Sequence, residues 1–242
     1  MANRSSLGFG ISSLTRALLG FTAQDYALAY FNRGVSYSNL GEYQTAIDDY
    51  TKAIQLDPDY ALAYYVRSWA YSELGQYQQA IRDFNEAIRI KGKFPQAYHN
   101  RALAFHSLSK YKEAIRDCTR AINLNPGLPS PYIVRGLAYV NLGKHKKAIR
   151  DYNKAIAISP DYAEAYNSLG ITLEELGCYD QAIAAHHKAL TIKPDYAEAH
   201  YNLGNVLKDL GRLDEAVASY NKALAIKPDL AEAHNNLGIA LK

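Results

Sequence analysis

The sequence predicts an all-α solenoid of antiparallel helix pairs, and three observations with one common period lead to this prediction. Prolines recur on a 34-residue register, with Gly92 in the one slot that lacks a proline. Two series of alanines follow the same register without an insertion or deletion. A fixed period of this length indicates stacked supersecondary units rather than a single globular core. The register residues are Pro58, Pro126, Pro160, Pro194 and Pro228, then Ala46, Ala80, Ala114, Ala148, Ala182 and Ala216, then Ala53, Ala87, Ala121, Ala155, Ala189 and Ala223.

One period, residues 163–196, shows two helical patterns in succession. Ala163 begins the first pattern, and Gly177 ends it as a glycine after a helix C-terminus does. The second pattern begins near Asp180 and ends before Pro194. Neither helix can bury its apolar stripe alone, so each pair is expected to pack on its neighbours.

This pattern divides the chain into a terminal segment, six complete repeats and one half repeat. Residues 1–26 predict a capping helix, because Ile11, Leu14, Ala17 and Leu18 have helical spacing; a targeting segment is the alternative. The repeats are 27–60, 61–94, 95–128, 129–162, 163–196 and 197–230. Residues 231–242 form the first helix of a seventh, incomplete repeat, with Leu237 and Leu241 partly uncovered. This helix is therefore predicted to self-associate, unless it is itself the cap or the native chain continues.

The repeat resembles that of the tetratricopeptide repeat family, which favours aromatic, small and proline residues at set positions. We number each repeat from its first residue, so that Ala27 and Ala61 occupy position 1. The first repeat carries Tyr30, Gly34, Tyr37, Ala46, Tyr50, Ala53 and Pro58, and the fourth carries Tyr132, Gly136, Tyr139, Ala148, Tyr152, Ala155 and Pro160. The resemblance covers residues 27–242. It implies a right-handed superhelix, with first helices on the concave face and second helices on the convex face.

Two positions of the repeat vary together. Repeats one to four have an arginine at position 7 and an aspartate at position 23, and repeats five and six lack both. This joint presence and absence predicts a half-buried ion pair that bridges the two helices of a repeat and has a structural role. The predicted pairs are Arg33 with Asp49, Arg67 with Asp83, Arg101 with Asp117, and Arg135 with Asp151.

Composition and motifs favour a non-catalytic protein of the cytoplasm. The chain is 48% apolar and 21% charged, and it has no apolar run of membrane-spanning length. Cys118 and Cys178 lack the spacing of a metal site or a disulfide framework, which favours a reducing compartment. The sequence has no phosphate-binding loop and no nucleophile motif, so we expect neither an active site nor a cofactor.

Charge is distributed unevenly along the chain. Residues 1–162 hold 20 lysines and arginines against 13 acidic residues, which gives +7, whereas residues 163–242 hold 7 against 11, which gives −4. The basic stripe in the first part is compatible with nucleic acid or an anionic membrane. Because acidic residues are interleaved with it, we prefer a solvated outer face and rank nucleic-acid binding below protein binding.

The family resemblance places positions 2, 5, 6, 9, 12 and 13 of each first helix in a concave groove. In repeats one to four this groove is apolar and aromatic, with Phe31, Tyr65 and Trp69 as predicted anchors. Leu103 and Leu137 have the stronger case for burial between neighbouring helices. The candidate peptide-binding residues are Phe31, Asn32, Tyr65, Trp69, His99, Asn100, Leu103, Ile133, Leu137, Asn202 and Asn236.

Two known ways in which members of this family bind peptides limit the ligands expected for this chain. The clamp for chaperone tails needs a lysine at position 5, where this chain has none, so chaperone tails are not expected. The last repeats resemble the helical arm of O-linked N-acetylglucosamine transferases, in which asparagines at position 6 grip peptide backbones. Here that ladder is broken by Val66, Val134 and Ser168. We therefore predict a scaffold that binds a peptide or helix of a partner protein; the alternative is the regulatory arm of a larger, glycosyltransferase-like enzyme.

Overall fold

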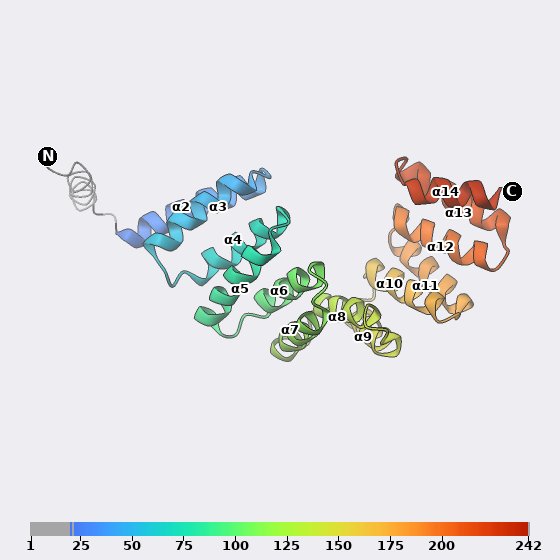
Figure 1. Cartoon of the computed structure of the whole chain (residues 1–242), viewed down its shortest axis with the longest axis horizontal. Helices are drawn as coiled ribbons and strands as arrows, with labels where there is room; N and C mark the ends of the chain where they lie inside the picture. The colour runs from blue at the N-terminus through green and yellow to red at the C-terminus, as the bar shows by residue number, and fades with distance from the viewer. Residues whose placement is uncertain (1–19, 21, 242) are drawn as a thin grey trace. The chain divides into compact units, whose positions relative to one another are not determined.

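The computed structural model describes residue 20 and residues 22–241, which form thirteen α-helices and no strand (Figure 1). The predicted all-α repeat solenoid is confirmed; the handedness of its superhelix stays a prediction. Even-numbered helices are the first helices of the repeats, and odd-numbered helices are the second. The helices are α2 (Ala23–Asn39), α3 (Tyr43–Leu56), α4 (Ala61–Glu73), α5 (Tyr77–Lys91), α6 (Pro95–Ser107), α7 (Tyr111–Leu124), α8 (Ser130–Val140), α9 (His145–Ile158), α10 (Ala163–Glu175), α11 (Tyr179–Ile192), α12 (Ala197–Asp209), α13 (Leu213–Ile226) and α14 (Ala231–Ala240).

The chain divides into two compact units, and the division falls between Leu108 and Ser109. Unit 1 contains α2 to α6, and unit 2 contains α7 to α14. The boundary separates the two helices of the third repeat, although the 34-residue register runs through it without a break. The predicted pair of Arg101 with Asp117 spans this boundary and stays a prediction.

The first helix begins earlier than the repeat pattern predicts. α2 starts at Ala23, four residues before the predicted start of the first repeat at Ala27. The cause is a capping box, in which Thr22 N donates to Asp25 Oδ2 at 2.6 Å and Asp25 N donates to Thr22 Oγ1 at 3.2 Å. The end of the predicted terminal segment therefore belongs to the first repeat. The rest of the capping helix predicted over residues 1–26 lies largely outside the described residues.

The turn between the helices of a repeat requires a residue in the left-handed region at position 15. Glycine occupies it in five repeats, with φ between 67° and 77°. The third repeat has Ser109 there, with φ of 57°. Among the described residues, Ser109 is the only one other than glycine that has a positive φ. A side chain with a Cβ atom makes this conformation unfavourable. The glycines are Gly41, Gly75, Gly143, Gly177 and Gly211.

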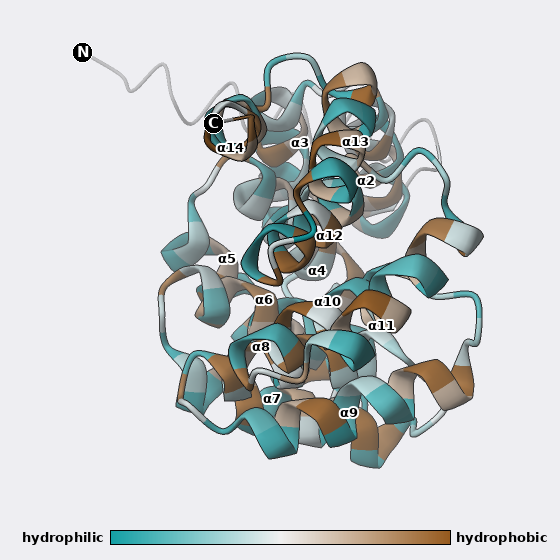
Figure 2. Ribbon diagram, turned by 90° about the vertical axis from the view of Figure 1, so that its right-hand side faces the viewer, coloured by the Kyte–Doolittle hydropathy of each residue, from teal (hydrophilic) through white to brown (hydrophobic). Residues whose placement is uncertain are grey.

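Within a repeat, the core depends on a close approach between position 8 and the ring at position 24. A Cβ atom on Gly204 would lie 2.5 Å from the Tyr220 ring, and one on Gly136 would lie 2.5 Å from the Tyr152 ring. Glycine therefore leaves room for the tyrosine ring in these two repeats, whereas the second repeat has Ser68 at position 8 opposite the fully buried Phe84. Both rings are fully buried. Brown and teal segments alternate along the helices in Figure 2, which is the pattern of amphipathic helices around such a core.

The last helix, α14, packs on unit 2 with one face only. Leu237 is half-buried and packs against the cluster of Leu203, Leu207 and Tyr220, whereas Ile239 is 53% exposed. Leu237 and Leu241 are thus both partly uncovered, as predicted: Leu241 is 67% exposed, and Leu237 is more covered because position 7 of a first helix faces the preceding repeat. Self-association through this helix stays a prediction.

A candidate peptide-binding cleft in unit 1

A cleft of about 410 Å³ lies between α4 and α6 in unit 1. Side chains of α4 and α6 form its walls, and the buried Phe84 of α5 contributes to its lining. Three predicted site residues lie together here: Trp69, Asn100 and Leu103. The cleft is lined by Trp69, Ser72, Glu73, Tyr77, Phe84, Asn100, Leu103, Ala104 and Ser107.

Two large apolar side chains of this cleft are accessible to a ligand. Trp69 is 38% exposed and Leu103 is 43% exposed. The indole of Trp69 makes an edge-to-face contact with the Tyr43 ring, with 5.5 Å between centroids and 84° between ring planes. This contact holds the indole in place without covering it. The exposure of Leu103 differs from the sequence analysis, which favoured its burial between neighbouring helices.

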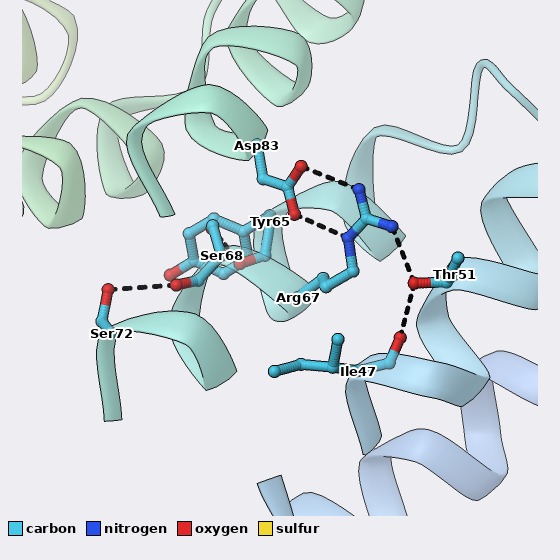
Figure 3. A network of polar contacts seen from close by, with 7 residues as sticks. All are labelled: Ile47, Thr51, Tyr65, Arg67, Ser68, Ser72 and Asp83. Carbon is cyan, nitrogen blue, oxygen red and sulfur yellow. Dashed lines mark hydrogen bonds and ion pairs between the residues drawn. The ribbon is translucent and has the colours of Figure 1, made fainter. Parts of the chain in front are cut away.

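A hydrogen bond ties the two walls of the cleft together. Asn100 Nδ2 on α6 donates to Tyr65 Oη on α4 at 2.9 Å. The Tyr65 ring packs on Phe94 at 4.8 Å, and burial raises the pKa of its hydroxyl. Tyr65 is thus a half-buried structural residue of the wall. Its backbone carbonyl also accepts from the Ser68 hydroxyl at 2.5 Å (Figure 3).

Ion pairs fix the helices behind the cleft. Arg67 donates to Asp83 from Nε at 2.6 Å and from Nη2 at 2.8 Å, in the two-point geometry that carboxylates prefer (Figure 3). The side chains of Arg67 and Asp83 are only 14% and 9% exposed. Arg33 with Asp49 and Arg135 with Asp151 form the same contacts at 2.6 and 2.7 Å, so three predicted pairs are confirmed.

The arginine also reaches back to the preceding repeat, which the sequence analysis missed. Arg67 Nη1 donates to Thr51 Oγ1 at 2.9 Å, and Arg135 Nη1 donates to Thr119 Oγ1 at 3.0 Å. Both threonines occupy position 25. Asn85 has the same position and accepts from Arg101 Nη1 at 2.6 Å. The available signal was the polar residue at position 25 that precedes the arginines of repeats two, three and four.

The predicted anchor Phe31 is not part of an accessible surface. It is only 9% exposed, because position 5 packs on two other rings, Tyr50 at 6.0 Å and Tyr60 at 5.0 Å. Ile133 occupies the same position and is 7% exposed. The sequence analysis was therefore wrong to treat Phe31 as an anchor: position 5 belongs to the core, whereas position 9, which holds Trp69 and Leu103, faces the cleft.

The other candidate residues are distributed between the two units. Asn32 is exposed, and His99 is half-buried, with its pKa lowered to about 4 by burial. In unit 2, Leu137 is half-buried against the cluster around Tyr152. None of these side chains lines the cleft of unit 1.

Asparagines at position 6 make a recurring contact in unit 2. Asn202 Nδ2 donates to Asn167 Oδ1 at 3.2 Å, and Asn236 Nδ2 donates to Tyr201 Oη at 3.2 Å. In each case the partner is the residue at position 5 of the preceding repeat, as it is for Asn100 in unit 1. These amides therefore join neighbouring first helices, which uses part of their capacity to hold a ligand backbone.

The described residues contain no group of three or more histidine, cysteine or acidic side chains placed to hold a metal ion. No helix in the described part of the chain is both long and apolar enough to cross a bilayer. The cleft offers apolar surface and hydrogen-bonding groups, which are suited to binding a ligand.

Comparisons with known protein families agree with the repeat geometry. The family description "TPR repeat" matches residues 70–109, 136–177, 175–211 and 204–242, which is more than half of the chain. "Tetratricopeptide repeat" matches residues 27–60 and 95–128, the ranges of the first and third predicted repeats, and a further match covers 49–82. A search of curated protein sequences gives no match.

Solved structures of several repeat proteins are similar to this chain. The structure of the APC/C hetero-tetramer Cut9–Hcn1 matches with a TM-score of 0.78 and 21% identity, over 89% of this chain and 43% of that chain. This chain thus spans less than half of that relative's length. MamA matches with a TM-score of 0.63 and 28% identity, over 72% of this chain and 95% of MamA. YrrB, a TPR protein with an unusual peptide-binding site, matches with a TM-score of 0.58 and 22% identity, over 77% and 96%. The chain belongs to the tetratricopeptide repeat family.

Proposed function

We propose that this protein is a non-catalytic scaffold that binds a segment of a partner protein in the cleft between α4 and α6. The observation that carries the proposal is the pair of exposed apolar side chains, Trp69 and Leu103, over a cleft of about 410 Å³. Exposed tryptophan in a preformed cleft is the typical anchor of a protein interface. Peptide binding by YrrB, a protein of the same fold, supports a ligand of this class.

The lining residues indicate the chemistry of the segment. An apolar side chain of the partner would contact Trp69 and Leu103. Asn100 donates one amide hydrogen to Tyr65, and an amide group has a second hydrogen and an acceptor oxygen that can pair with a peptide backbone. Glu73 lies at the same cleft and would favour a neighbouring basic residue. The lining therefore favours a peptide with an apolar anchor flanked by a cation.

Alanine substitutions test this site. Peptides are selected from a random library with the native protein, and the affinity of the best binder is then measured. Trp69→Ala with Leu103→Ala should weaken binding by roughly 2–4 kcal/mol, because both anchors lose their contact area. The matched control is Leu40→Ala with Leu74→Ala, which removes exposed apolar side chains at position 14, outside the groove positions of the same unit, and should leave the affinity unchanged. Equal affinities of the cleft variant and the native protein, with helicity unchanged, would contradict the proposal.

A second candidate function is an arm of a larger glycosyltransferase-like enzyme. The observation in its favour is the asparagine ladder of unit 2, where Asn202 and Asn236 lie on neighbouring first helices. In this case the gene should encode a catalytic domain after Lys242. Sequencing the reading frame past that codon decides between the two functions, since a stop codon there removes this candidate.

A further inference from the structure

We propose that the outer face of α7 and α9 in unit 2 binds an extended, acidic segment of a polypeptide. These are the second helices of the third and fourth repeats. Together with the residue before each helix they carry nine lysines and arginines, and all nine side chains are exposed. We call this surface the basic face; its cations are Lys110, Lys112, Arg116, Arg120, Lys144, Lys146, Lys147, Arg150 and Lys154. The proposal is independent of the cleft in unit 1.

The cations of the basic face form one row along each helix. Lys112, Arg116 and Arg120 are spaced four residues apart on α7, and Lys146, Arg150 and Lys154 have the same spacing on α9. Side chains four apart are neighbours on a helix surface, and like charges in such pairs destabilise the helix. The rows therefore cost stability in the absence of a ligand, and an anionic ligand would relieve their repulsion.

On the other second helices of unit 2, only the last of these three positions is cationic. On α11 they hold Asp180, Ala184 and Lys188, and on α13 they hold Asp214, Ala218 and Lys222. These helices have the same fold and the same register without a basic row. Helix formation and repeat packing therefore do not require the cations of α7 and α9, which points to a role in binding.

In the sequence, acidic residues interleaved with the cations would offset the positive charge of α7 and α9. In the structure, these acidic residues are mostly buried and do not offset it at the surface. Asp151 is 6% exposed and accepts two hydrogen bonds from Arg135, at 2.7 and 2.8 Å, so its charge is directed inward and neutralised. Asp117 is 4% exposed. Among the acidic residues of α7 and α9, only Glu113 is more than slightly accessible, and it is half-buried. The basic face is thus more positive than the sequence indicates.

A cleft of about 770 Å³ borders the basic face on the side of Arg150 and Lys154, and it is lined by residues of α7, α8 and α9. Arg150 and Lys154 supply cations for side-chain carboxylates. Asn123 and Asn153 supply amide groups that can pair with a peptide backbone. Ile122 contributes an apolar contact. The combination fits an acidic peptide better than a free anion, which would need neither amides nor apolar surface.

Geometry and aromatic content favour a peptide over nucleic acid. Four residues of helix rise about 6 Å, and alternate residues of an extended peptide are about 6.6 Å apart, so acidic side chains at alternate positions match a cation row. Single-stranded nucleic acid is usually held by stacking its bases on aromatic rings. Among the residues that line the cleft, only Tyr132 is aromatic. The centroid of its ring lies 5.6 Å from the Arg135 guanidinium carbon, and its hydroxyl donates to the Pro126 carbonyl at 3.3 Å. The ring is therefore not a free stacking surface.

The test measures fluorescence anisotropy of a labelled peptide of alternating glutamate and serine. The native protein should bind it with an affinity that falls as salt is raised. Arg116→Glu with Arg150→Glu should weaken binding by about tenfold or more, because both cation rows are reversed at their centres. The matched control, Lys188→Glu with Lys222→Glu, makes the same change of net charge on α11 and α13 and should change the affinity by less than about threefold.

Three results would overturn the proposal. One is equal weakening in both variants, which would mean that only net charge matters. Another is tighter binding of an oligothymidylate of matched charge, which would assign the face to nucleic acid. The third is tighter binding to phosphatidylserine vesicles, which would assign it to a membrane. A neutral pair, Arg116→Gln with Arg150→Gln, guards against misfolding: it should melt no lower than the native protein and still lose the peptide.

Discussion

At the scale of single residues, the ion pairs between positions 7 and 23 are the clearest case of a sequence pattern with a physical cause. Arg67 and Asp83 are both nearly buried, whereas Arg33, in the equivalent pair with Asp49, is 55% exposed. Removing one partner of a buried pair leaves an uncompensated charge, while an exposed partner can be solvated. The same chemical pair should therefore differ in its contribution to stability between the two repeats.

Aspartate substitutions measure this difference. Asp83→Ala should lower the free energy of unfolding by about 3 kcal/mol, because it strands Arg67 away from water. Asp49→Ala should cost clearly less, since Arg33 remains solvated. The double variant Arg67→Leu with Asp83→Ala copies the fifth repeat, which has Leu169 and Ala185. It should regain much of the loss in urea unfolding; additive losses from the two single changes would show that the positions are not coupled.

His186, at the position where three other repeats have tyrosine, makes the stability of the fifth repeat depend on pH. It fills the ring position against Gly170, is fully buried, and donates a hydrogen bond from Nδ1 to Asn167 Oδ1 at 3.1 Å. Burial, and to a smaller degree His187, lower the pKa of His186 from 6.5 to about 4. Between pH 4 and pH 6.5, the His186 side chain therefore binds more protons in the unfolded state than in the folded state. The contribution to stability is therefore present above pH 6.5 and is lost as the pH falls towards 4.

Replacement by tyrosine isolates this effect, because tyrosine occupies the same position in three other repeats. Unfolding of the native protein and of His186→Tyr is measured between neutral pH and pH 4. The native protein should lose roughly 3 kcal/mol more than the variant over this window. All other titrating groups, including the half-buried Glu174 with its pKa raised to about 7, are common to both proteins. Parallel curves for the two proteins would show that His186 does not titrate with folding.

At the scale of elements, the turn of the third repeat departs from the others. Ser109 holds the left-handed conformation that glycine holds in five turns. Ser109→Gly should therefore raise the free energy of unfolding by about 1 kcal/mol, because the Cβ strain is relieved and only partly offset by the entropy of glycine. Gly143→Ser is the matched control and should cost a similar amount, since Gly143 has φ of 67°. A destabilised Ser109→Gly protein would contradict this explanation.

Helix order and helix ends followed from the sequence because the period is strict. Prolines or glycines mark every boundary except the turn at Ser109, and the first helices α4, α6, α10, α12 and α14 begin at position 1 of their repeats. α2 differs because the capping box at Thr22 and Asp25 is not part of the repeat. The division into two units was not predictable from the register, which continues unchanged past Leu108.

The candidate site was predicted less completely than the fold, for a reason specific to repeat proteins. Periodicity identifies the first-helix face but does not separate position 5, which packs on the rings at positions 24 and 34, from position 9, which faces the cleft. Phe31 and Trp69 therefore looked alike in sequence, although one is 9% and the other 38% exposed. Such a distinction depends on contacts between repeats, which only the structure supplies.

At the scale of the whole molecule, we propose one partner-binding surface in each unit. Unit 1 has an apolar cleft around Trp69 and Leu103, and unit 2 has the basic face on α7 and α9. Neither surface contains a metal group among the described residues, and both combine side-chain contacts with amide groups suited to a peptide backbone. We propose that the main partner binds in the cleft of unit 1.

Fluorescence of Trp69 tests this claim most directly, because it is the only tryptophan of the chain. Its indole is 38% exposed in the free protein and would be covered by a peptide in the cleft. Titration with a library-selected peptide that lacks tryptophan should shift the emission to shorter wavelengths, with the same saturation curve as an independent calorimetric titration. Saturable binding by calorimetry without any change in the emission of Trp69 would contradict the account.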